Sequence, residues 1–267
     1  MIRDITLGQY YPAESFLHSM DPRSKIVLTF TFILSLFLAK GAPGYGVAFL
    51  FLVLAIRASK VPPRFMLKGL KAVFMIILLT VFINLFLTPG GAVLFQWGVF
   101  KVTRTGLETA VFMALRLIFL IVGSSILTLT TSPISLTDGI EALLKPWEKV
   151  KVPAHEIAMM MTIALRFIPI LLEETDKIMK AQMARGADFE SGGLVKKAQS
   201  LIPLLVPLFI SSFRRADDLA LAMEARCYRG GEGRTRMKRL SYTRVDVAAA
   251  LVVAAYLLAL GLLARWL

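Results

Sequence analysis

Long apolar runs separated by short basic stretches dominate the hydropathy pattern of this 267-residue chain. Runs that contain few charges are typical of helices that cross a membrane. The first two are short, because a helix of 14 residues covers only about 21 Å of a hydrocarbon core about 30 Å thick. They can still span if flanking Lys and Arg side chains reach the interface or if the bilayer thins, and a re-entrant pair is the alternative. The five predicted spans are 26–39, 44–56, 72–87, 106–129 and 247–263.

The region between the fourth and fifth runs has a different pattern. It predicts two long helices, 153–186 and 193–229, each apolar in its first half and charged in its second. A shorter helix over 137–150 precedes them, with Thr137 as its expected N-cap. The glycines Gly186, Gly192 and Gly193 separate the two long helices, and Pro169, Pro203 and Pro207 should kink them.

These patterns predict an all-α integral membrane protein. About five transmembrane helices are joined by a cytoplasmic platform of crossed, kinked helices between spans four and five. The predicted parts are residues 1–131, 132–246 and 247–267.

The charge of the chain bears on its orientation. A formal net charge of +13 accompanies 57% hydrophobic residues, a combination that fits the Lys/Arg excess on the cytoplasmic side of membrane proteins better than nucleic-acid binding. The short loop after span two carries five basic residues, whereas Lys40 is alone after span one, and Lys101 and Arg104 follow span three. The N-terminus and the platform are therefore expected in the cytoplasm and the C-terminus outside. The five basic residues are Arg57, Lys60, Arg64, Lys68 and Lys71.

The two long platform helices each end in an Ala-Arg pair. Ala184-Arg185 and Ala225-Arg226 coincide when the sequence is laid over itself at an offset of 41 residues. In each copy the Arg lies seven residues after an aliphatic residue, Ile178 or Leu219, and so falls at the tip of the apolar stripe. A repeated cation of this kind suits docking to two similar sockets on a partner. The alternative is an ordinary cation favoured by the dipole of a helix C-terminus.

Three motifs in order along the chain carry a resemblance to a known family. The chain resembles the T component of energy-coupling factor (ECF) transporters, a transmembrane coupling subunit. One departure is Cys227, which stands where the first copy has Gly186, both being small residues. The motifs are Ser15-Phe16-Leu17-His18-Ser19-Met20-Asp21-Pro22-Arg23-Ser24-Lys25; then Arg166-Phe167-Ile168-Pro169, Glu173 and Ala181-Gln182-Met183-Ala184-Arg185-Gly186; then Ile202-Pro203-Leu204, Arg215-Ala216 and Ala222-Met223-Glu224-Ala225-Arg226-Cys227-Tyr228.

The resemblance implies a subunit that is not itself an enzyme. Two cytoplasmic ABC-type ATPase subunits would bind its coupling helices and carry the ATP and Mg²⁺, while this chain binds no cofactor. One or more separate membrane proteins, the S components, would capture a vitamin or a metal ion and dock on the same helices. The expected location is the plasma membrane of a prokaryote, with the lipid bilayer as a further partner and no nucleic acid.

The resemblance and the residues together assign three groups of site residues. ATPase binding is expected at Ala184, Arg185, Gly186, Ala225, Arg226 and Cys227. S-component docking is expected at Met159, Met160, Leu172, Leu201, Leu205 and Phe209. A structural role is expected for His18, Asp21, Pro22, Arg23, Pro169 and Pro203.

Other functions remain as alternatives. One is a T component dedicated to a single cobalt or nickel uptake system. A membrane-embedded enzyme would need facing carboxylates or histidines at the end of a span, and a secondary transporter would need more intramembrane polar residues than Asn84 and Arg116. His18 and His155 are isolated and lack the spacing of metal ligands, so no metal site is expected. Arg116, inside span four, is either functional or held by a hydrogen bond within the bundle.

Overall fold

The computed structural model describes residues 10–88, 90, 92–97, 100–187, 189, 193–231 and 239–266. The chain forms two compact units. The bundle unit comprises the described residues of Gly8–Gly139 and Lys238–Leu267, and the α6–α7 unit comprises those of Ile140–Met237.

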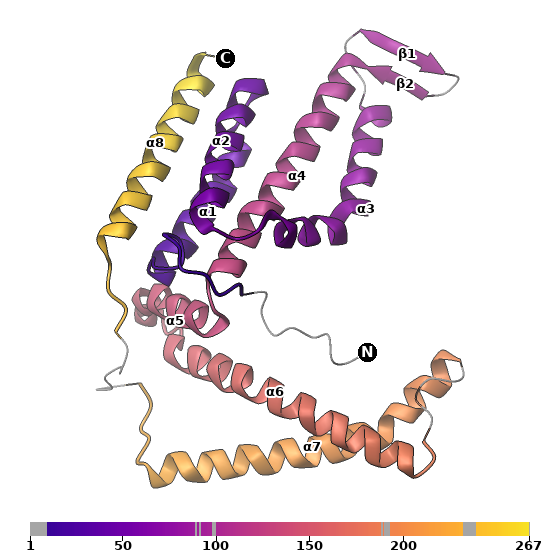
Figure 1. Ribbon diagram of the computed structural model, residues 1–267, viewed down its shortest axis with the longest axis vertical. Coiled ribbons are helices and arrows are strands. Elements are labelled where there is room, and N and C mark those ends of the chain that lie inside the picture. The colour runs from indigo at the N-terminus through magenta and orange to yellow at the C-terminus, as the bar shows by residue number, and fades with distance from the viewer. Residues whose placement is uncertain are drawn as a thin grey trace. The chain divides into compact units, whose positions relative to one another are not determined.

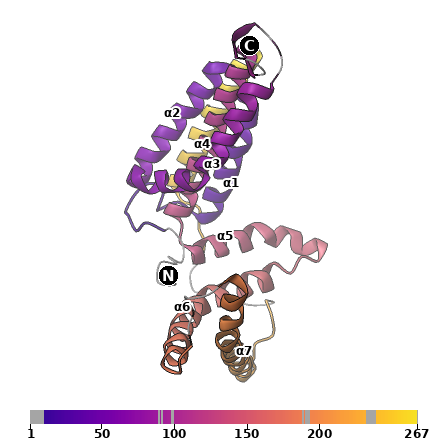
Figure 2. The same cartoon turned by 90° about the vertical axis from the view of Figure 1, so that its right-hand side faces the viewer.

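Five helices make up the bundle unit: α1 (Pro22–Leu38), α2 (Gly41–Ser59), α3 (Pro63–Leu87), α4 (Arg104–Thr130) and α8 (Arg244–Trp266). Helix α4 packs against α1, α2 and α3, and α8 packs against α1 and α2 (Figure 1). Figure 2 shows the same helices running side by side. All five predicted apolar runs are therefore helical, and most of the helices extend past their run into flanking polar residues.

The direction of each bundle helix follows from contacts at one end. The backbone N–H of Asp21, just before α1, donates to Asp246 in the first turn of α8, so these two helices begin together. The C-terminal end of α4 reaches the same place, because the Thr130 carbonyl accepts from Lys25. Helix α3 begins there too, because the Tyr11 N–H donates to the Leu129 carbonyl at the end of α4 and the Tyr11 ring packs on Phe65. Helix α2 connects the far end of α1 to the start of α3. Thus α1, α3 and α8 run one way, and α2 and α4 run the other.

The core of the bundle lies between α1, α2, α4 and α8. The Phe51 ring stacks on the rings of both Phe32 and Tyr256, and the Tyr256 hydroxyl bonds to Ser35 Oγ at 2.8 Å. Gly123 of α4 permits the close approach of α1, because a Cβ there would lie 2.6 Å from the Phe32 ring. The buried members of this core are Phe32, Leu36, Ala39, Tyr45, Ala48, Leu52, Val61, Met66, Phe119, Val122, Ile126, Leu129, Tyr256 and Leu260.

A short two-stranded ribbon joins α3 to α4. Strands β1 (Val93–Trp97) and β2 (Phe100–Thr103) pair antiparallel, with a register shift between Val93 and Phe95. The sequence analysis did not predict these strands. The remainder of the described chain agrees with the predicted all-α class.

By length and composition, five helices in the described part of the chain are long and apolar enough to cross a membrane. They are α2, α3, α4, α8 and α6 (Ala154–Ala184). The first predicted span is not among them, because α1 has 17 residues and covers only about 26 Å. Its contacts with α4 and α8 nevertheless make it a full member of the bundle.

Helix α5 (Pro133–Leu144) begins earlier than predicted. Thr137 is not its N-cap, because it lies inside the helix, is 1% exposed, and donates its hydroxyl to the carbonyl of Pro133. Ser132 occupies the cap position instead, and its Oγ accepts the N–H of Ser135. A proline at the first helical position favours this start, since its missing N–H has no partner in the first turn anyway. The short 3₁₀ helix η2 (Lys145–Val150) follows.

The α6–α7 unit contains α6 and α7 (Leu194–Ala225), which pack against each other. Gly193 is the N-cap of α7, so one of the glycines predicted to separate the two helices does mark the boundary, whereas Gly192 lies outside the described residues. Pro169 lies inside α6, and Pro203 and Pro207 lie inside α7, as the sequence indicated.

Candidate coupling site

The first Ala-Arg motif ends α6 in a Schellman arrangement. Arg185 is the C-cap, and Gly186 follows in the left-handed region with φ +87°. The N–H of Gly186 donates to the Met183 carbonyl at 3.0 Å, and the N–H of Ala187 donates to the Gln182 carbonyl at 3.0 Å. These two bonds satisfy carbonyls that the end of a helix otherwise leaves without partners.

The second motif ends α7 with the same geometry. Arg226 is the C-cap, and Cys227 follows with φ +55°. The N–H of Cys227 donates to the Glu224 carbonyl at 2.8 Å, and the N–H of Tyr228 donates to the Met223 carbonyl at 3.0 Å. The repeat seen in the sequence is therefore a repeat of backbone structure.

The Gly186 and Cys227 positions have more in common than small side chains. Both residues adopt a left-handed backbone conformation. Glycine adopts that conformation without a steric penalty, whereas a residue with a Cβ is disfavoured there by about 1 kcal/mol. Cys227 accordingly holds a conformation that is rare for its type.

The two arginines are available for contact with a partner. Arg185 and Arg226 are exposed, as are Ala184, Gly186, Ala225 and Cys227. Within the described residues no ion pair or hydrogen bond involves either guanidinium group. An exposed, unpaired guanidinium keeps its full set of donors for a carboxylate.

Contacts between α6 and α7 place the two motifs at opposite ends of the helix pair. Gln182 of α6 meets Pro203 of α7, and Glu174, eight residues earlier, meets Ser211, eight residues later. The helices therefore pack antiparallel in this stretch. Arg185 lies just beyond Gln182, whereas Arg226 is 23 residues beyond Pro203, or roughly 35 Å along α7.

A polar cluster holds the pair together. Glu174 accepts a hydrogen bond from Ser211 at 3.1 Å through one carboxylate oxygen and forms an ion pair with Arg215 through the other. Gln182 binds a carbonyl that a proline leaves without its helical donor. Pro207 has no N–H, so the Pro203 carbonyl lacks its usual partner within the helix, and the Gln182 amide nitrogen donates to it at 3.4 Å.

The residues predicted to dock an S component fall on a surface that the α6–α7 unit leaves uncovered. Met160 is 58% exposed and Phe209 61%, and Met159 and Leu172 are half-buried. The only fully buried apolar residue described in α7 is Leu204. We call seven exposed apolar residues of α7 the apolar face: Leu201, Ile202, Leu205, Val206, Phe209, Ile210 and Phe213.

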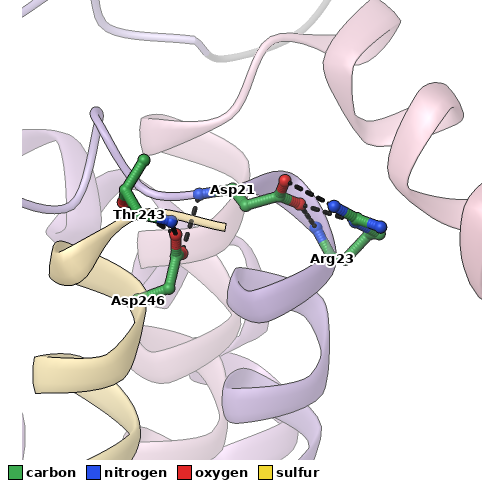
Figure 3. Close-up of polar contacts among 4 residues, drawn as sticks. All are labelled: Asp21, Arg23, Thr243 and Asp246. Carbon is green, nitrogen blue, oxygen red and sulfur yellow. Dashed lines mark hydrogen bonds and ion pairs between the residues drawn. The ribbon is translucent and has the colours of Figure 1, made fainter. Parts of the chain in front are cut away.

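The predicted structural motif near the N-terminus joins α1 to α8 (Figure 3). Asp21 caps α1 by accepting the Arg23 N–H, and both its oxygens bind the Arg23 guanidinium at 3.0 Å. Pro22 is the first residue of α1. The Asp21 N–H donates to Asp246 Oδ1 at 2.9 Å, while Asp246 Oδ2 accepts the N–H and the hydroxyl of Thr243.

His18 and Lys25 extend this motif to α4. His18 Nε2 donates to the Tyr11 carbonyl at 2.9 Å, so its Nδ1 accepts from the Ser15 hydroxyl at 2.6 Å. Lys25 precedes the apolar run of α1 and is 5% exposed, and its Nζ donates to the carbonyls of His18 and Thr130.

Sequence reasoning missed several residues that the structure brings to these sites. Asp246 could have been found, because Thr243-x-x-Asp246 before an apolar run is a capping-box signal.

Arg116 has partners from distant parts of the chain: its Nε donates to the Tyr45 hydroxyl at 3.1 Å, and its guanidinium lies 5.3 Å from the Phe37 ring. Of the two alternatives for Arg116, the structure shows the hydrogen bond within the bundle. Glu174 gave no signal in the sequence beyond its charge.

Comparisons of the sequence with known proteins show the family of this chain. The sequence profile of the family CbiQ, described as cobalt transport protein, matches residues 13–237. The chain is 58% identical over 266 residues to the energy-coupling factor transporter transmembrane protein EcfT of Clostridium kluyveri, covering 99% of this chain and 98% of the relative. It is 56% identical over 266 residues to the protein of that name from Acidaminococcus fermentans, covering 100% and 98%, and 48% identical over 260 residues to that from Bacillus subtilis, covering 97% and 98%. On these matches, this chain belongs to the CbiQ family of transport proteins, as an energy-coupling factor transporter transmembrane component of the EcfT type.

Proposed function

We propose that this chain couples ATP hydrolysis in two ABC-type ATPase subunits to the movement of a substrate-binding S component, for uptake of a micronutrient such as a vitamin. The chain itself hydrolyses nothing, and ATP and Mg²⁺ are bound by its partners. One observation carries the proposal: two helix ends with the same Schellman backbone present exposed arginines at opposite ends of one antiparallel pair.

The spacing of the motifs favours two sockets over one. Arginines separated by roughly 35 Å along α7 are too far apart to enter a single groove. A guanidinium placed between carboxylates on a partner forms charge-assisted and often bidentate bonds. Two ATPases that approach or separate on ATP binding would then pull on opposite ends of the α6–α7 pair.

The apolar face of α7 supports docking of a membrane partner. Soluble surfaces rarely leave so many large apolar side chains uncovered in one place. An S component that presents an apolar helix would cover this face, and the methionines of α6 can adapt to more than one such partner.

The bundle supports an orientation with the N-terminus and the α6–α7 unit in the cytoplasm. The ends where α1, α3 and α8 begin and α2 finishes carry many cations, among them Arg57, Lys60, Arg64 and Lys68, whereas Lys40 and Arg265 lie at the other ends. An excess of Lys and Arg in short loops marks the cytoplasmic side. With five bundle helices crossing, the C-terminus lies outside.

Copurification tests the proposal. The full-length protein, extracted mildly from its native membrane, should bring down two ABC-type ATPase subunits and at least one small membrane protein. The sequence has no G-x-x-x-x-G-K-[ST] phosphate loop, so the isolated chain should not hydrolyse ATP. ATPase activity in the rigorously isolated chain, or recovery without any ATPase, would contradict the proposal.

The description of the family as cobalt transport proteins favours one second candidate, a subunit dedicated to cobalt or nickel uptake. The two candidates differ in the S component and not in this chain. Identification of the copurified membrane proteins decides between them, because a shared subunit brings down several S components and a dedicated one brings down a single metal-binding partner.

A further inference from the structure

The segment after the second Ala-Arg motif contacts the start of α6 through His155. The hydroxyl of Tyr228, two residues after Arg226, lies 3.4 Å from Nε2 of His155. On the other side of the ring, Nδ1 lies 3.1 Å from Oε1 of Glu141, near the C-terminal end of α5. The imidazole therefore stands between the α7 motif and α5, with one ring nitrogen toward each.

The backbone beyond Tyr228 also packs on this ring. A Cβ built at Gly231 would lie 2.9 Å from Cγ and Cδ2 of His155, closer than real Cβ atoms approach other atoms. The side chains of His155 and Glu141 are 22% and 17% exposed. A half-buried ring with contacts on three sides has little freedom to turn, so it can pass on a displacement.

Helix α5 connects this contact to the bundle unit through its own backbone. Gly139, two residues before Glu141, packs on α1: a Cβ there would lie 3.0 Å from Pro22 Cβ and 3.1 Å from Ile26 Cδ1. Because hydrogen bonds link every turn of a helix, α5 moves as one body over this short distance. Glu141 and Gly139 therefore lie on one continuous helix.

The first motif has no such contact with α5 among the described residues. Among the residues that the structure describes, no side-chain hydrogen bond joins 185–187 to another element. The two Ala-Arg ends share a backbone fold, but the described contacts link only the second one to α5.

Building on the proposed function, we infer that His155 is a positioning residue that connects the Arg226 motif to α5 through the Tyr228–His155–Glu141 contacts. A partner that pulls on the end of α7 thereby moves the C-terminal end of α5, where Glu141 lies. His155 contacts neither nucleotide nor cargo in this scheme.

Hydrogen exchange on the full-length protein, with and without its ATPase pair, supplies the test. In the wild type, ATPase binding should slow exchange in three segments: 182–187, 223–231 and 133–144. In His155→Ala and in Tyr228→Phe, protection of 182–187 should persist while the added protection of 133–144 disappears. Loss of one hydrogen bond should also make exchange in 223–231 roughly two- to tenfold faster in the free protein.

Three controls make the outcome decisive. His155→Gln can still donate to Glu141 and accept from Tyr228, so it should restore much of the protection of 133–144. Tyr228→Phe removes only a hydroxyl and decides the matter if His155→Ala folds poorly. The inference is overturned if ATPase-dependent protection of 133–144 is unchanged in Tyr228→Phe and His155→Ala, or is missing in the wild type. Failure of the proposed function looks different, because then the ATPases protect neither motif in the wild type.

Discussion

The two units of this protein differ most in how they treat their own apolar surface. The bundle unit buries large side chains such as Phe32, Phe119 and Tyr256 between its helices. Among the described residues of the α6–α7 unit, the buried apolar side chains are only Ala154, Ala158 and Leu204. One unit has an extended core of its own, and the other is a pair of long helices that bury few apolar side chains.

The difference indicates what each unit needs from outside. The bundle has its helix ends joined by Asp21, Asp246 and Lys25, and its exposed apolar residues suit contact with lipid. Glu174 and Gln182 make the polar contacts between α6 and α7 in the described residues, and the apolar face of α7 is left uncovered. A pair with so little core can change its crossing at low cost, which is what a coupling element requires.

The largest expected effect comes from reversing both motif charges. In Arg185→Glu with Arg226→Glu, each site would set a carboxylate against the acidic socket that the proposed function requires on the ATPase. Losing one such contact costs about 2–5 kcal/mol, or roughly 30-fold to several thousand-fold in affinity. Binding of the purified ATPase pair to the protein in detergent should be weakened by each single change and undetectable in the double variant.

Lys180→Glu is the matched control for those variants. It makes the same charge change at an exposed position of α6, one turn before the motif. It should leave ATPase affinity within about twofold of wild type, the size expected for a surface change away from the contact. Equal losses in Lys180→Glu and Arg185→Glu would mean that general charge, and not the motif, governs binding.

The next largest effect falls on the bundle. Asp246→Ala removes the acceptor of the Asp21 N–H and of both Thr243 donors, and a buried donor left without a partner costs about 1–3 kcal/mol. Thermal unfolding of the detergent-solubilised protein should show a loss of about 3 kcal/mol in stability. Asp217→Ala removes the same charge from an exposed position of α7 and should have almost no effect. Similar losses in both variants would argue against the joining role of Asp246.

A smaller and more selective effect is expected on the apolar face. Leu205 is 43% exposed, so Leu205→Glu should hardly change the stability of the free protein. It should weaken S-component retention by roughly tenfold or more, because the charge is desolvated in the interface. Leu205→Met keeps the side chain apolar and should retain the partner. Loss of the ATPases with retention of the S component would reverse the assignment of the two surfaces.

The smallest effect separates the two copies of the motif. Cys227→Gly should stabilise the end of α7 by about 1 kcal/mol or less, because glycine tolerates the left-handed conformation that cysteine holds at φ +55°. Gly186→Ala should destabilise the end of α6 by a similar amount. Hydrogen exchange at the amides of residues 228 and 187 reports these changes locally. Opposite signs are expected, and equal signs would mean that backbone conformation is not what distinguishes the copies.

Sequence patterns predicted the parts of this fold that rest on local information. Apolar runs located the five bundle helices, and Ala184-Arg185-Gly186 and its repeat located two helix ends. The N-cap of α5 was wrong, because Thr137 looked like a cap only when the Ser132-Pro133 start was overlooked. The ribbon between α3 and α4 was missed because its strands have only five and four residues.

The features that could not be predicted depend on contacts between distant residues. Asp21 and Asp246 are 225 positions apart, and Arg116 and Tyr45 are 71 apart, so no local pattern connects them. Likewise, the Gln182 contact with the Pro203 carbonyl requires knowledge that Pro207 frees that carbonyl and that the helices run antiparallel. The membrane location of the parts 1–131, 132–246 and 247–267 stays a prediction.

The central claim is that both Ala-Arg ends lie under an ATPase in the working complex, and the single cysteine of the chain allows a direct measurement. Cys227 is exposed and follows Arg226, so its rate of maleimide labelling should fall when the ATPase pair is bound. Exchanging the two left-handed residues, Gly186→Cys with Cys227→Gly, moves the only thiol to the end of α6, where the same fall is expected. Labelling rates that the ATPases leave unchanged at both positions would contradict the account.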